Sequence, residues 1–125
     1  MAMPNPYQVY QQQSVMTASP GDLTLMLFNG CLKFMGRAEL ALEKKDLAGA
    51  HEALLRAQDI IAELMSSLDM QYELSGNLLA LYEFIYRHLV QANIKKDPSL
   101  IAEAVALVAE LRDAWAEAVQ VTRAR

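Results

Sequence analysis

Two histidines and one cysteine are the scarcest side chains of this 125-residue sequence that could bind a metal or serve as nucleophile and base. A carboxylate-bridged di-metal site in a helical bundle uses a Glu-x-x-His motif on each of two helices. The residue three before His51 is Ala48. The residue three before His88 is Ile85. Neither histidine belongs to such a motif, so we expect no metal and no other cofactor.

The single cysteine, Cys31, could pair with a histidine for nucleophilic catalysis, but it lies in the middle of an apolar helical pattern. A cysteine buried in such a pattern behaves as a small hydrophobic residue and not as a reactive thiolate. The two nearby glycines, Gly30 and Gly36, also fall inside the helical pattern and do not form a phosphate-binding loop. We therefore expect a protein without enzymatic activity.

Charge and hydropathy limit the partners and the compartment. The net charge is -4, whereas a nucleic-acid-binding protein usually carries a basic excess, so we expect no nucleic acid partner. The N-terminus lacks the basic and apolar segments of a signal peptide, and no run of about 18 apolar residues could span a membrane. A lone cysteine fits a reducing compartment. These features indicate a cytoplasmic protein without direct membrane insertion.

The elements that must position any functional side chain are helices. Four helix starts can be read from residues that favour helix N-caps. In two of them a proline follows, which suits the first helical position because its missing N–H needs no partner there. The predicted caps are Ser19, Asp46, Ser75 and Asp97, with Pro20 and Pro98 after the first and the last.

Each predicted helix repeats apolar residues at a spacing of three and four, which is typical of one buried face. Short connections favour antiparallel neighbours. We therefore expect an all-α fold, an antiparallel up-down four-helix bundle over residues 19–125 with an N-terminal extended arm over residues 1–18. Trp115 falls within the fourth stripe and should be largely buried against the first or third helix. The predicted apolar stripes are, on the first helix, Leu23, Leu27, Cys31, Phe34, Met35, Ala38 and Leu42, and on the second, Leu47, Ala50, Leu54, Ala57, Ile61, Leu64, Met65 and Leu68. On the third and fourth helices they are Leu78, Leu81, Tyr82, Ile85 and Leu89, and Leu100, Ala104, Leu107, Val108, Leu111, Trp115, Ala118 and Val119.

The first and third helices carry more apolar residues than one buried face requires. On the third helix, Leu79, Tyr86 and Val90 share a flank spaced i, i+7, i+11. Such a helix is either buried on several sides or covered by a partner. Two explanations stay open: these helices form a central pair, or they line a groove that receives an apolar helix of another chain. The extra residues of the first helix are Leu25, Met26, Leu32 and, at the edge of its stripe, Phe28.

Three long segments resemble the FliS family, the cytoplasmic export chaperones of bacterial flagellin. The resemblance extends from Asn5 to about Gln120, and the segments come in the family's order. They are NPYQVYQQQSVMTASPGDLTLMLFNGCLKF, LYEFIYRHLVQANIKKD and LRDAWAEAV.

The resemblance implies an antiparallel helical bundle that binds the disordered C-terminal segment of flagellin, prevents premature polymerisation and delivers flagellin to a component of the flagellar export gate. It implies no cofactor and no catalysis. In the family an N-terminal arm can lie over part of the flagellin-binding surface, and two tyrosines stand where the family places the arm's anchors. The partner-binding residues that we expect are Tyr7, Tyr10, Leu79, Tyr82, Tyr86 and Val90.

Two alternatives stay open at this point. The arm could be a tail with two incidental tyrosines. The bundle could be a self-associating helical adaptor without a flagellin client, whose apolar flanks meet copies of itself.

Overall fold

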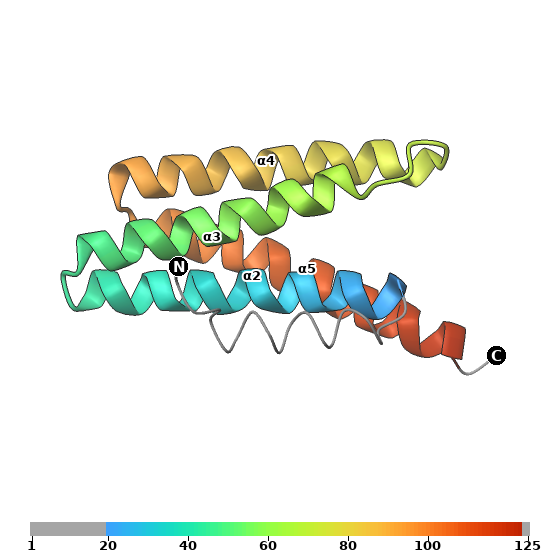
Figure 1. The fold of residues 1–125 in the computed structure, drawn as a ribbon, viewed down its shortest axis with the longest axis horizontal. Coiled ribbons are helices and arrows are strands. Elements are labelled where there is room, and N and C mark those ends of the chain that lie inside the picture. The colour runs from blue at the N-terminus through green and yellow to red at the C-terminus, as the bar shows by residue number, and fades with distance from the viewer. Residues whose placement is uncertain (1–19, 124–125) are drawn as a thin grey trace, which may run out of the picture.

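The computed structural model describes residues 20–123, which form four helices packed as an antiparallel up-down bundle (Figure 1). These described residues contain no strand, so the predicted all-α bundle is confirmed. The arm over residues 1–18 and the predicted cap Ser19 lie outside the described residues. The helices are α2 (Pro20–Glu43), α3 (Leu47–Ser66), α4 (Glu73–Lys95) and α5 (Pro98–Arg123).

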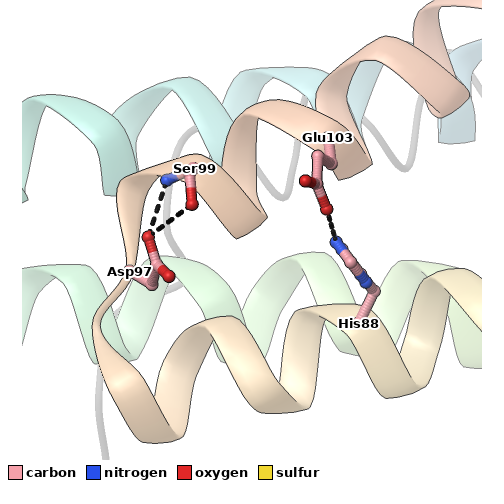
Figure 2. A network of polar contacts seen from close by, with 4 residues as sticks. All are labelled: His88, Asp97, Ser99 and Glu103. Carbon is pink, nitrogen blue, oxygen red and sulfur yellow. Dashed lines mark hydrogen bonds and ion pairs between the residues drawn. The ribbon is translucent and has the colours of Figure 1, made fainter.

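Two predicted helix starts are set by an aspartate at the N-cap. The Oδ1 atom of Asp46 accepts the backbone N–H of Gly49 at 2.9 Å. The Oδ1 atom of Asp97 accepts the hydroxyl and the backbone N–H of Ser99 at 2.7 and 2.9 Å (Figure 2). These bonds to Ser99 hold the pKa of the Asp97 carboxyl below its usual value. The bonds from the backbone N–H groups of Gly49 and Ser99 satisfy helix donors that have no partner within the helix.

The predicted cap of the third helix, Ser75, is wrong. Helix α4 begins at Glu73, after the N-cap residue Tyr72, whose side chain makes no capping hydrogen bond. Ser75 is buried in the first turn, and its hydroxyl donates to the backbone carbonyl of Asp69 at 2.6 Å. The Ser75 hydroxyl therefore links α4 to the α3–α4 connection by a hydrogen bond and does not cap the helix.

The hydrophobic core lies between all four helices. Helix α2 packs against α3 and α5, and α4 packs against the same two helices. Both α2 and α4 touch two neighbours, but so do α3 and α5. A central position therefore does not distinguish the two helices that carry surplus apolar residues.

Every residue of the predicted stripes except Leu47 and Ala118 is buried or partly buried, so the phase of the stripes is confirmed. Leu47 is 58% exposed, because it is the first residue of α3 and stands at the end of the bundle. Phe28 was expected at the edge of the buried stripe and is 1% exposed. Leu32 also packs on the core. The second apolar face of α2 is thus partly explained by its contacts with two neighbouring helices.

Trp115 is partly buried and packs against the core, in agreement with the expected burial. It does contact α2 as predicted: its indole N–H donates to the backbone carbonyl of Gly21 at 3.0 Å. Its ring meets Phe28 edge-on, with 6.2 Å between ring centroids. The ring also borders a cavity at this end of the bundle.

Candidate partner-binding surface

Three of the predicted partner-binding residues lie on one flank of α4. At 100° per residue, Leu79, Tyr86 and Val90 fall within an arc of about 40°. All three are partly buried. Tyr86 packs against the buried core, whereas Leu79 and Val90 are not among the described residues packed on it. The flank therefore offers a partner two aliphatic side chains and the accessible part of a tyrosine.

Tyr82, also predicted to bind a partner, belongs to the core and not to this flank. It is 2% exposed, and its ring centroid lies 6.4 Å from that of Phe28. Burial raises the pKa of its phenol. Tyr82 lines the cavity at the end of the bundle, so it could meet a partner only through that cavity.

The remaining two predicted partner-binding residues, Tyr7 and Tyr10, lie outside the described residues. Their role stays a prediction.

The cavity next to the α3–α4 connection was missed by the sequence analysis. Its volume is about 260 Å³. Tyr72 and Leu74 border it and are 69% and 63% exposed. The one signal in the sequence was the presence of large apolar residues in a connection between helices, where polar residues are usual. The lining residues are Thr24, Leu64, Ser67, Leu68, Asp69, Tyr72, Leu74, Ser75, Leu78, Tyr82 and Trp115.

The histidines take part in contacts between helices. The Nε2 atom of His88 on α4 lies 2.7 Å from a carboxylate oxygen of Glu103 on α5 (Figure 2). The imidazole of His88 also stacks on Phe84, with 5.5 Å between ring centroids. His51 on α3 contacts the side-chain amide of Asn93 on α4 at 2.9 Å. Both histidines thus connect neighbouring helices.

Cys31 is fully buried, and its thiol faces the backbone carbonyl of Ala57 at 3.8 Å. Burial raises the pKa of the thiol to about 12. Within residues 20–123 there is no group of three or more histidine, cysteine, aspartate or glutamate side chains that could hold a metal ion. None of the helices described is both long and apolar enough to cross a membrane.

Comparison with known proteins gives consistent matches over nearly the whole chain. The sequence profile of the family described as Flagellar protein FliS matches residues 3–122. The flagellar secretion chaperone FliS of Bacillus subtilis (strain 168) is 51% identical over 123 residues, which cover 98% of this chain and 92% of the relative. The flagellar secretion chaperone FliS of Escherichia coli (strain K12) is 38% identical over 115 residues, covering 90% and 85%.

A solved structure supports the same fold. It is described as a crystal structure of a flagellar chaperone from bacteria and aligns with a TM-score of 0.75, covering 91% of this chain and 94% of its own. Its sequence identity to this chain is 24%, so it shows the shared fold and nothing finer.

Proposed function

This chain belongs to the FliS family and is a flagellar secretion chaperone, and on that premise we propose that its client is the disordered C-terminal segment of flagellin. The observation that carries the proposal is the 51% identity to a flagellar secretion chaperone over 98% of the chain. By covering this segment in the cytoplasm, the protein would prevent premature polymerisation and deliver flagellin to a component of the export gate.

The α4 flank is where we place part of the client contact. Leu79 and Val90 are apolar, are not part of the packed core and lie on the same side of the helix. An amphipathic client helix could lay its apolar face along this side. Tyr86 adds a ring and a hydroxyl, which suits a surface that is apolar in one part and hydrated in another.

The energetics require that the client touch more than this flank. Ordering a disordered partner costs about 2–5 kcal/mol. At about 25 cal/mol per Å², some 200 Å² of apolar surface would offset the upper figure. Association itself costs about 4–15 kcal/mol more. Three partly buried side chains do not supply that much surface, so we expect the client to wrap several faces of the bundle.

The arm is proposed to act as a tethered competitor through Tyr7 and Tyr10. A tethered segment acts at a high effective concentration, so weak contacts suffice to keep an apolar surface covered. Replacing both tyrosines with alanine should leave the fold intact. Client binding tightens in this variant if the arm only competes, and weakens if the arm also contacts the client.

Calorimetric titration with a flagellin C-terminal peptide tests the proposal. A 1:1 complex with the peptide supports it, whereas an unchanged homo-oligomer that ignores the peptide favours the self-associating adaptor. The double variant Leu79→Ser with Val90→Ser should bind the peptide more weakly. Wild-type affinity in this variant would show that the flank is assigned wrongly.

A matched control separates binding from stability. Leu40 and Val121 are 55% and 52% exposed on α2 and α5, so Leu40→Ser with Val121→Ser removes apolar surface away from the α4 flank. Its affinity should fall less than that of the Leu79/Val90 variant. A cooperative melt of the Leu79/Val90 variant far below that of the control would mean that the flank belongs to the core.

A further inference from the structure

The cavity beside the α3–α4 connection has the size and chemistry of a site for one apolar side chain. Its volume of about 260 Å³ is below the range of roughly 300–1,000 Å³ usual for small-molecule sites. The hydroxyls of Ser67 and Ser75 and the indole N–H of Trp115 already donate to backbone carbonyls. These lining groups therefore offer few free donors to a polar ligand, and the surface left to an occupant is mainly apolar.

The mouth of this cavity carries an exposed apolar rim. Met70, Tyr72 and Leu74 are 57%, 69% and 63% exposed, and the latter two line the cavity itself. A pocket surrounded by exposed large apolar residues is the arrangement in which a partner's anchor side chain contributes most to binding energy. The rim and the cavity together form a surface that we call the α3–α4 end.

The stretch of chain that forms the α3–α4 end, from the end of α3 into α4, carries charge of one sign. Between Arg56 and Arg87 the sequence contains no lysine, arginine or histidine. The same stretch contains five acidic residues, all of them exposed. They are Asp59, Glu63, Asp69, Glu73 and Glu83.

The cations of α5 do not neutralise this stretch, because each already has an acidic partner. Arg112 pairs with Asp113, and Arg123 pairs with Asp22. The acidic field of the α3–α4 end is therefore available to a partner of opposite charge.

We propose that the α3–α4 end is a docking surface for a cationic amphipathic helix of another protein, which inserts one bulky apolar side chain into the cavity and sets lysine or arginine residues against the surrounding carboxylates. The inference does not rest on the flagellin proposal, because it concerns the end of the bundle and not the α4 flank. Anionic partners are disfavoured, since both nucleic acid and an anionic lipid surface would be repelled by the five carboxylates. A positively charged protein segment is the occupant that satisfies both the cavity and the charge.

A synthetic helix of leucine and lysine, about four turns long, with one tryptophan on its apolar face, is the probe. Binding is measured by the anisotropy of a fluorescein attached to the peptide. The full-length wild-type protein should bind this peptide, and the affinity should fall as NaCl rises from about 0.05 to 0.5 M. A peptide with every lysine replaced by glutamate should not bind, and replacing its tryptophan with alanine should weaken binding. No binding of the cationic peptide, or equal binding of the acidic one, would overturn the proposal.

The acidic contribution is tested with two pairs of variants that change the net charge equally. Asp69→Asn with Glu73→Gln should weaken peptide binding by about fivefold, since two surface charge pairs are lost. Glu52→Gln with Glu110→Gln removes two exposed carboxylates on α3 and α5, outside the Arg56–Arg87 stretch. If both double variants weaken peptide binding equally, the effect comes from the net charge of the protein and not from a local site, and the proposal is overturned.

The apolar contribution is tested in the same way. Tyr72→Ser with Leu74→Ser should weaken binding by at least about tenfold, because both side chains border the cavity. This variant should fold, since both residues are largely exposed and serine is favoured at the N-cap position that Tyr72 occupies. Leu40→Ser with Ile94→Ser, which alters exposed residues near the opposite end of the bundle, should leave affinity unchanged. Wild-type affinity in the Tyr72/Leu74 variant, with an unchanged melt, would overturn the proposal.

Discussion

Replacing Trp115 tests what holds α5 to the start of α2. The side chain contributes in two separable ways: the indole N–H donates to the carbonyl of Gly21, and the ring packs on Phe28. Truncating a fully buried tryptophan to alanine costs about 3–5 kcal/mol. Trp115 is partly exposed and borders an existing cavity, so less packed surface is lost. We therefore expect Trp115→Ala to lower the free energy of unfolding by about 2–3 kcal/mol.

The variant Trp115→Phe separates the hydrogen bond from the packing. A net hydrogen bond contributes about 0.5–1.5 kcal/mol. Here the acceptor carbonyl of Gly21 keeps its intrahelical partner, because residues of a helix bond from N–H to the carbonyl four positions before. The acceptor is thus not left unsatisfied, and Trp115→Phe should cost about 1 kcal/mol or less.

Urea denaturation followed by far-ultraviolet circular dichroism measures both variants without relying on the fluorescence of the replaced residue. The slope of the free energy against urea should not change, because the surface exposed on unfolding stays nearly the same. Val121→Ala, at an exposed position on the same helix, should fall within about 0.5 kcal/mol of the wild type. A loss under about 1 kcal/mol for Trp115→Ala would refute the packing assigned here, since that is the size of an ordinary surface effect.

Three other features give predictions of their own. Gly49→Ala should destabilise the protein by about 1 kcal/mol, because an added Cβ would collide with the capping carboxylate of Asp46, while Gly36→Ala, with open space at its Cβ, should stabilise by about 0.5–1 kcal/mol in the same urea titration. The thiol of Cys31, with a pKa raised to about 12 by burial, should resist a thiol-specific reagent at pH 8 in the native state and react once urea unfolds the chain. Rapid labelling without urea would contradict that burial. The pKa of Asp97 is lowered by its hydrogen bonds, so its contribution is complete above the ordinary pKa near 3.8 and is lost as the pH falls below it. Asp97→Asn should therefore show a smaller drop in melting temperature between pH 5 and pH 2 than the wild type, and equal drops would refute the assignment.

Capping chemistry and hydrophobic periodicity in the sequence were sufficient to predict most of the bundle. The N-caps Asp46 and Asp97 act on N–H groups within three residues of themselves, so local sequence contains the whole interaction. The buried stripes of α3 and α4 follow from the helical repeat, because one face of each helix must meet its neighbours. The same local logic failed at Ser75, whose hydroxyl bonds a carbonyl six residues earlier in a connection that bends back on the helix.

The exposure of particular side chains was decided only by the tertiary arrangement. Leu47 has the right helical phase for the core, yet it stands at the end of the bundle where no neighbouring helix reaches it. Trp115 has the same kind of phase but borders a cavity formed by all four helices. Periodicity gives the direction in which a side chain points from its own helix. Burial depends on whether another helix lies in that direction at the same level along the bundle. The cavity, assembled from residues up to 91 positions apart between Thr24 and Trp115 (115 minus 24), exists for that reason only in the folded chain.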